Sequence, residues 1–339
     1  MTLPLPQPPL ILLNLEGATL PFHMDWMRAL AELRTRTSTH FFQFWSLFGE
    51  IEGYVLIIAL IFAVFDKRLG TRMAVLVLLA MSLNHILKTI IQNPRPFVFE
   101  GSWMQKWAVP PENARELVAE FSTPSGHAMA AAAAYGFIAL SVKDRAVKLL
   151  AIAVLALTGL SRPYLGVHYV EDIALGWLIG LGLAWLAFRW GDRIARTWQR
   201  LGLIPGLGLC SAATAAIWLG TITATSGQLA GQPNAFLSYL GFLTGLCVAM
   251  PLEARYVNFQ PAGERWMQKL ARYFLCVLLV GLTLGLLDSG FSRLTDDDSF
   301  SGDVLRYFRY ALASVAGFFI APLALARIFE AQAGFKASG

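Results

Sequence analysis

Residues 121–140 read FSTPSGHAMAAAAAYGFIAL, a short polar motif followed at once by an apolar run rich in small side chains. A helix needs about 20 mainly apolar residues to cross the hydrocarbon core of a membrane. Residues 124–142 form one such candidate span, and no alternation typical of strands competes with it. The alanines of residues 128–134, which Met129 interrupts, predict a face at which helices pack closely, as do Gly176 and Gly180.

The rest of the chain has the same apolar character. Of its 339 residues, 56% are hydrophobic and 14% are charged, and the mean hydropathy is +0.55. Soluble domains usually carry about 25% charged residues, so this composition excludes a disordered chain, a coiled coil and an ordinary soluble enzyme. We expect an all-α, polytopic transmembrane helical bundle of about nine spans. The expected spans are 46–65, 73–92, 124–142, 149–167, 170–188, 203–224, 235–253, 273–290 and 306–326.

The basic residues predict an orientation for these spans. Fourteen Lys and Arg fall in one set of loops, and seven fall in the opposite set, which includes the N-terminal arm. Cytoplasmic loops are the richer in Lys and Arg, so we expect the N-terminus outside and the C-terminus inside. The predicted location is an integral membrane one, in a bacterial inner membrane. The net charge of +5 is scattered between apolar runs, so we expect a bilayer and no nucleic acid as partner.

Three polar clusters interrupt the apolar pattern. They read KTIIQNPRP at residues 88–96, TPSGH at 123–127 and SRPYLGVHYVED at 161–172. Polar and charged groups near membrane spans are costly and usually functional. On the predicted orientation all three clusters face the outer side, although the loop charges alone decided that orientation. The clusters therefore predict one extracytoplasmic site.

The residue types in these clusters predict phosphoryl transfer. Lys88, Arg95 and Arg162 are three cations, which suit the charge on phosphate oxygens in the transition state. Ser125 and Gly126 stand where a helix begins, and the free amides of a helix N-terminus bind anions. These five residues are the predicted phosphate-binding set.

Two histidines and an aspartate complete the predicted chemistry. His168 and Asp172 are four residues apart and share one face of a helix. A carboxylate on one ring nitrogen leaves the other nitrogen free as a nucleophile. We expect a phosphohistidine on His168, with His127 as the acid for the leaving oxygen and later as the base for water. Each motif alone has an ordinary alternative: a structural His–Asp pair, a turn, or a lysine that reaches toward the membrane surface.

The three motifs resemble the signatures of the type 2 phosphatidic acid phosphatase superfamily. K-x6-R-P, P-S-G-H and S-R-x5-H-x3-D occur here in that order and without substitution, within roughly residues 46–190. The resemblance implies a metal-independent phosphatase with no cofactor and the same division of roles. Those roles are catalytic for His168, His127 and Asp172, and phosphate-binding for Lys88, Arg95, Ser125, Gly126 and Arg162.

The chain departs from the six-span bacterial members of that family. It lacks a span before residue 46, and about four more spans follow the core. This topology is similar to that of glucose-6-phosphatase and sphingosine-phosphate phosphatases. We expect an extracytoplasmic arm at 1–45, a phosphatase core at 46–190 and a C-terminal transmembrane extension at 191–339. Within the arm, residues 1–20 are predicted to be extended, and residues 22–40 to be an interfacial helix or a plain surface arm.

The sequence leaves the substrate open. We expect a lipid phosphate or lipid pyrophosphate to be hydrolysed; phosphatidate, polyprenyl pyrophosphate, a sphingoid phosphate and a lipid A phosphate all fit. A lipid-linked phosphotransferase, a phosphatase for a soluble ester and a phosphate-binding transporter are the alternatives. The oligomeric state is also open.

Four further features have both a functional and an ordinary interpretation. The loop 97–122 is either a specificity lid or an interfacial anchor. Glu50 and Glu52 either line the site or face headgroups, and residues 296–298 hold either a cation or only solvent. His85 and Asn84 either support Lys88 or bond between helices. The cysteines, Cys210, Cys247 and Cys276, lie in apolar runs, so we expect no disulfide framework.

Overall fold

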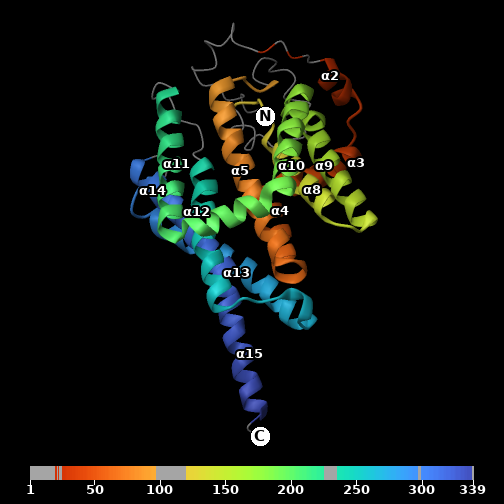
Figure 1. The fold of residues 1–339 in the computed structure, drawn as a ribbon. Coiled ribbons are helices and arrows are strands. Elements are labelled where there is room, and N and C mark those ends of the chain that lie inside the picture. The colour runs from red at the N-terminus through yellow and green to blue at the C-terminus, as the bar shows by residue number, and fades with distance from the viewer. Residues whose placement is uncertain are drawn as a thin grey trace. The chain divides into compact units, whose positions relative to one another are not determined.

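Helices make up the regular structure of the described residues, and these ranges contain no strand. The computed structural model describes residues 25–96, 120–224, 235–296 and 299–337, together with Leu20 and Phe22 (Figure 1). Its elements are α2 (Asp25–Glu32), α3 (Arg36–Ser46), η1 (Leu47–Gly49), α4 (Ile51–Leu60), η2 (Ile61–Phe65), α5 (Lys67–Ile91), α8 (Gly126–Ser141), α9 (Arg145–Leu165), α10 (Val170–Leu201), α11 (Leu203–Ala224), α12 (Ala235–Tyr256), η4 (Pro261–Gly263), α13 (Trp266–Phe291), α14 (Phe300–Val315), η5 (Ala316–Ile320) and α15 (Ala321–Ala337).

The expected bundle of membrane helices is confirmed. In the described part of the chain, seven helices are long and apolar enough to cross a membrane, or eight if a bent pair near the N-terminus counts as one span. The two remaining differences from the nine expected spans are local. The first expected span is that bent pair, residues 36–49 and 51–65, with a bend of 62°. The third is α8, whose 16 residues reach about 24 Å at 1.5 Å per residue, less than the roughly 30 Å hydrocarbon core.

The helix expected over residues 22–40 is two helices, α2 and α3. Thr35 separates them in an extended conformation, and its side chain accepts a hydrogen bond from the backbone amide of Ser38. The Ser38 hydroxyl in turn accepts from the Thr35 amide, which completes a capping box. Such a box starts a new helix because it satisfies amides that have no partner within the first turn.

The chain divides into two units, which are described separately. Unit 1 comprises Met1–Gly53, Ala80–Phe188 and Ile217–Pro233, and unit 2 comprises Tyr54–Leu79, Arg189–Ala216 and Asn234–Gly339. All of the predicted site residues belong to unit 1.

Helix α8 is the centre of unit 1, and small residues allow its neighbours to approach it. Most of α8 is buried, and α9 packs along it. On α10, a Cβ atom at Gly180 would lie 2.3 Å from the carbonyl oxygen of Met129, and one at Gly176 would lie 2.9 Å from that of Ser125. Neither position has room for a side chain. The prediction that Gly176, Gly180 and the small residues of α8 form a packing face is confirmed.

Helix α3 fixes the N-terminal segment of unit 1 against α9. The ring of Phe42 stacks on that of Tyr164 at 4.1 Å between centroids, and the Ser38 hydroxyl lies 2.7 Å from the Tyr164 hydroxyl. Arg34 adds a hydrogen bond of 2.7 Å from Nε to the Tyr164 carbonyl oxygen. Because α3 is held here, the η1 turn and Glu50 that follow it have a defined place beside α8.

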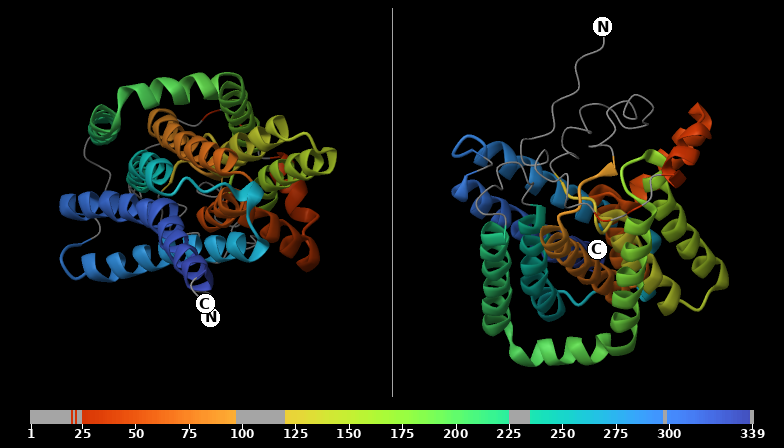
Figure 2. Two further views of the ribbon diagram at one scale, coloured as in Figure 1. Left: turned by 60° about the horizontal axis from the view of Figure 1, so that its bottom comes forward. Right: turned by 90° about the horizontal axis from the view of Figure 1, so that it is seen from above.

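Unit 2 is held by another close helix pair and by buried charge. Helices α12 and α13 both pack against α14 (Figure 2). Cβ atoms at Gly241 and Gly245 of α12 would lie 2.3 and 2.2 Å from backbone oxygens of α14, so the backbones touch. The fully buried Glu253 pairs with Lys67 at 2.9 Å. The ammonium of Lys67 lies 4.8 Å from the ring centre of Phe259.

Several expectations concern residues outside the described ranges. They include the lead-in at 1–19, residues 97–119 of the loop 97–122, and two of the three aspartates at 296–298. The three cysteines are described and are free, with Cys210 and Cys247 3.7 Å apart at their sulfur atoms.

Candidate active site

The first motif lies where α5 ends. Gln92 has a positive φ of 52°, which turns the chain out of the helix directly after Ile91. Asn93 then joins this turn to the second motif: its side-chain amide donates to Thr123 Oγ1 at 2.9 Å, and its carbonyl oxygen accepts from the Ser122 amide at 2.7 Å. Lys88 is on the last turn of α5, and the nearly buried Arg95 follows the turn.

The second motif forms the N-terminus of α8. Ser125 is the N-cap, and its hydroxyl accepts a hydrogen bond from the Ala128 amide at 3.5 Å. A Cβ atom at Gly126 would lie only 3.2 Å from Asn84 Oδ1. The side-chain amide of Asn84 also donates to the Pro124 carbonyl oxygen at 2.9 Å. Asn84 therefore supports the turn that carries Ser125 and Gly126.

The third motif begins at the end of α9. Gly166 ends the helix with φ 83°, a left-handed conformation that glycine adopts without strain. The buried guanidinium of Arg162 donates from Nη1 to Ser46 Oγ at 2.7 Å. Among the described residues, no atom accepts from Arg162 Nε, although that nitrogen is buried.

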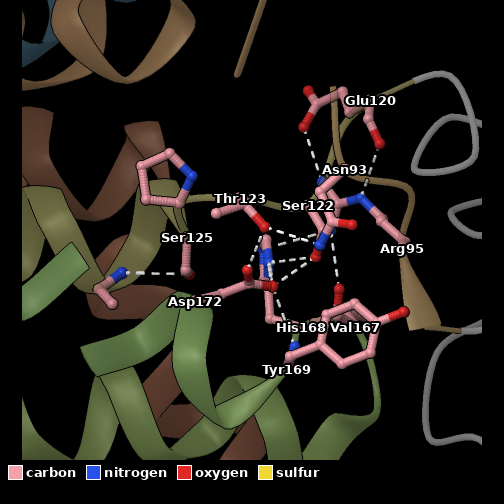
Figure 3. A network of polar contacts seen from close by, with 12 residues as sticks. Asn93, Arg95, Glu120, Ser122, Thr123, Ser125, Val167, His168, Tyr169 and Asp172 are labelled. Atoms are coloured by element: carbon pink, nitrogen blue, oxygen red, sulfur yellow. Dashed lines mark hydrogen bonds and ion pairs between the residues drawn. The ribbon is translucent and has the colours of Figure 1, made fainter. Parts of the chain in front are cut away.

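His168 lies between α9 and α10, with a different neighbour at each ring nitrogen. Nδ1 is 3.2 Å from Asp172 Oδ2, and Nε2 is 3.3 Å from Nη1 of Arg95 (Figure 3). A guanidinium only donates hydrogen bonds, so Nε2 is the acceptor and carries no proton. The proton of the neutral ring is then on Nδ1 and points to the carboxylate. This arrangement leaves the Nε2 lone pair on the side of the cations.

Asp172 is held by three donors besides His168. The Ser122 hydroxyl donates to Oδ2 and the Thr123 hydroxyl to Oδ1, and the Tyr169 amide donates to Oδ2 at 3.0 Å. Figure 3 shows these groups converging on the carboxylate. Asp172 is fully buried, so these donors replace the water that the charge loses. The carboxylate, and with it the imidazole, has one fixed orientation.

A carboxylate that we did not predict lies between two of the predicted phosphate-binding cations. Glu120 Oε2 is 2.8 Å from Nη2 of Arg95 and 3.1 Å from Nζ of Lys88. Partial burial raises the pKa of Glu120, but the charges of Lys88 and Arg95 lower it more, to about 2. Glu120 is therefore ionised at every pH at which a protein is usually studied, and serves as the counter-ion of both cations.

The surroundings also keep His168 neutral. Burial lowers the pKa of His168 well below its usual value, and the nearby charges of Arg95, Lys88 and Arg162 lower it further. An uncharged imidazole is the form that attacks phosphorus. The same interactions link His168 to three of the predicted phosphate-binding cations, so the structure brings these residues into one electrostatic cluster.

His127 faces a second carboxylate. Its Nε2 is 2.9 Å from Oε1 of Glu50. Glu50 follows η1, at the bend between residues 36–49 and 51–65. Of the two interpretations of Glu50 and Glu52, Glu50 contacts the site and Glu52 is exposed. Within the described ranges, no group of three or more His, Cys, Asp or Glu side chains is placed to hold a metal ion.

Comparisons with known proteins identify the family. A family model described as the PAP2 superfamily matches residues 69–196, and a second, described as the PAP2 superfamily phosphatase transmembrane extension, matches residues 237–333. The chain belongs to the PAP2 superfamily. The resemblance to type 2 phosphatidic acid phosphatases that the three motifs carry is thus confirmed.

Curated lipid phosphatases match part of the chain. Phosphatidylglycerophosphatase B of Bacillus subtilis is 34% identical over 35% of this chain and 56% of its own length. Sphingosine-1-phosphate phosphatase 2 of Mus musculus is 30% identical over 41% of this chain and 39% of its own length. Undecaprenyl-diphosphatase of Sulfolobus acidocaldarius is 26% identical over 36% and 53%. The matches thus cover about half or less of these relatives. No solved structure gives a significant match.

The PAP2 motifs do not include all the residues that build this site. Ser122 and Thr123 hold Asp172, Asn84 and Asn93 hold the loops, and Glu120 and Glu50 contact the cations and His127. Ser122 and Thr123 directly precede Pro-Ser-Gly-His, so their position next to the motif was an available signal. His85 bonds to Thr221 Oγ1 at 3.1 Å, which is the ordinary role between helices.

Proposed function

We propose that this PAP2 protein hydrolyses a lipid phosphate or lipid pyrophosphate through a phosphohistidine on His168. The observation that carries the proposal is the orientation of the His168 ring. Asp172 accepts a hydrogen bond from Nδ1–H, and the Nε2 lone pair is turned to Arg95 at 3.3 Å. A neutral, oriented imidazole beside cations is equipped to attack a phosphorus atom.

The reaction then has two steps. In the first, Nε2 of His168 bonds to phosphorus while the bond to the leaving oxygen breaks, and His127 gives that oxygen a proton. In the second, water attacks the phosphorus, His127 takes its proton, and the bond to nitrogen breaks. Lys88, Arg95 and Arg162 neutralise the phosphate oxygens in both steps, and Ser125 and Gly126 add donors at the N-terminus of α8. A lipid ester and water thus give a lipid alcohol and phosphate.

The relatives support a lipid substrate. Their names refer to phosphatidylglycerophosphate, sphingosine 1-phosphate and undecaprenyl diphosphate, which share a phosphate or diphosphate on a lipid. Phosphatidate and a lipid A phosphate have the same reactive group. The excess of basic residues in the opposite loops supports an extracytoplasmic site in a bacterial inner membrane. The division into arm, core and extension at residues 45 and 190 remains part of this proposal.

The first experiment measures phosphate release from a panel of these lipids in detergent with EDTA, using wild type and His168→Ala. Release that withstands EDTA and disappears in the variant is the expected result. Equal release by both proteins would contradict the assignment of His168. Transfer of phosphate to an added alcohol, with little release to water, would favour the phosphotransferase that the same phosphohistidine permits. Activity on a soluble ester alone would exclude a lipid-specific enzyme.

A further inference from the structure

Glu50 and His127 form a second carboxylate–imidazole pair within the site. Oε1 of Glu50 lies 2.9 Å from Nε2 of His127. The preceding residue, Gly49, lies directly against the same ring, because a Cβ atom there would be 2.6 Å from Cδ2 of His127. The Tyr135 hydroxyl, also on α8, donates to the Phe48 carbonyl oxygen at 2.9 Å. The turn that carries Glu50 is therefore fixed against α8 from two directions.

The pair sets which nitrogen of His127 is left for chemistry. The carboxylate accepts a hydrogen bond from Nε2, so Nε2 carries a proton in both charge states of the ring. Nδ1 is then the atom that gains and loses the working proton. The pair mirrors His168 and Asp172, where the carboxylate bonds to Nδ1 and Nε2 is the reactive atom.

The charges around His127 explain why a carboxylate is needed. Burial of the ring disfavours its protonated form most, and the charges of Arg162 and Arg95 disfavour it further. Glu50 is the anion bonded directly to the His127 ring, and it opposes these cations. Without its charge, an acid beside two guanidinium groups would lose its proton too readily to protonate an alcohol oxygen.

We propose that Glu50 is a positioning residue that fixes a proton of His127 on Nε2, leaves Nδ1 as the reactive atom and stabilises the protonated ring, an inference that rests on the phosphatase function proposed above. In the first step Nδ1 gives its proton to the leaving oxygen as the bond from phosphorus to that oxygen breaks. In the second step Nδ1 takes a proton from water as the water oxygen bonds to phosphorus. Glu50 stays ionised throughout and stabilises the imidazolium.

The test compares Glu50→Gln with Glu52→Gln, a matched control two residues away with an exposed side chain. Dodecyl phosphate has a poor leaving group that needs an acid, whereas p-nitrophenyl phosphate has a good one that does not. For Glu50→Gln we expect kcat/KM on dodecyl phosphate to fall about 10- to 100-fold, the usual range for losing part of general acid catalysis. On p-nitrophenyl phosphate we expect a change below about threefold. Glu52→Gln should match wild type on both.

A pH profile and a double-mutant cycle separate this role from a structural one. In Glu50→Gln the alkaline limb of kcat/KM for dodecyl phosphate should move about one unit to lower pH. Glu50→Asp keeps the charge, so its limb should stay near that of wild type. In a His127→Ala background, Glu50→Gln should add less than about a twofold loss, since both changes remove the same acid.

Three results would overturn the inference. They are an equal loss on both esters, an unmoved alkaline limb, and a further loss in the His127→Ala background that multiplies the first. None of them concerns the phosphatase function itself, which fails only if wild type releases no phosphate or His168→Ala retains the activity.

Discussion

The backbone amide of Ser125 donates a hydrogen bond of 3.2 Å to the backbone carbonyl oxygen of Asp172. This bond joins the N-terminus of α8 to the first turn of α10. Further along α10, Gly176 and Gly180 bring α8 and α10 into backbone contact. The distance between the predicted phosphate-binding turn and the His168–Asp172 pair is thus set by helix packing as well as by the polar residues themselves.

Gly180→Ala should destabilise unit 1. The added Cβ atom would lie 2.3 Å from the Met129 carbonyl oxygen and 2.6 Å from the Cβ of Ala132, so the helices must separate. We expect a loss of about 1–3 kcal/mol, the usual effect of overpacking, measured by thermal unfolding in detergent. Gly182→Ala on the same helix is the control, because nothing lies within 4 Å of its Cβ position. Equal melting temperatures for the two variants would contradict the packing described here.

Asp172→Asn should leave the fold intact and stop the reaction. The asparagine keeps the shape of a side chain that Ser122, Thr123 and the Tyr169 amide hold in place. Its neutral amide no longer offers an anion to Nδ1–H, so the ring loses the charge that holds its proton on Nδ1 and stabilises the phosphorylated imidazole. We expect kcat to fall by about 10²–10⁴, as for other buried carboxylates paired with a catalytic histidine. The measurement is steady-state phosphate release, and a loss below tenfold would argue against the role of Asp172.

The acid limb of the pH profile should report the charges around His168. Burial and the neighbouring cations lower the pKa of His168, so the neutral ring that the proposed mechanism needs persists below the usual pKa of about 6.5. Arg95→Gln removes a cation and should move the acid limb of kcat/KM to higher pH. Glu120→Gln removes an anion and should move it to lower pH. We expect shifts of about half to one unit in opposite directions; shifts of the same sign would refute this electrostatic picture.

Glu120→Gln should also strengthen inhibition by inorganic phosphate. The carboxylate occupies the cations Lys88 and Arg95, so an incoming phosphate competes with it. The variant should lower the inhibition constant about 3- to 10-fold, which corresponds to about 1 kcal/mol for a partly exposed ion pair. Glu32→Gln, an exposed glutamate on α2, serves as the control. Weaker inhibition in Glu120→Gln would mean that Glu120 assists phosphate binding.

In unit 2, Lys67→Met should be strongly destabilising. It leaves the fully buried Glu253 without its cation, and loss of one partner of a buried pair costs about 3–5 kcal/mol. The double variant Lys67→Met with Glu253→Met should recover most of that loss, since it leaves no uncompensated charge. Denaturation of the full chain in detergent checks both. Equal instability of the single and double variants would show that packing, rather than charge, controls this position.

The sequence predicted the helices well where apolar runs decide them. It did not predict the break at Thr35 or the bend at Glu50, because single capping residues and a short turn set those positions. The candidate site residues came from three motifs whose members are near one another in the chain. Glu50 was left with two interpretations, and Glu120 was missed as a site residue, because their partners are 77 and 25–32 residues away. Tertiary packing brings such pairs together, and a single sequence contains no signal for it.

The position of Glu120 has a consequence for the lipids that surround the protein. Most bilayer phospholipids are diesters with one negative charge on phosphate, and they greatly outnumber any substrate. A diester that entered the site would displace Glu120 from Lys88 and Arg95 and replace one negative charge with another. A monoester or diphosphate brings more charge and gains from the exchange. Because Glu120 already neutralises Lys88 and Arg95, we expect membrane diesters to compete weakly for these cations. The charge on the phosphate group then decides which lipids bind.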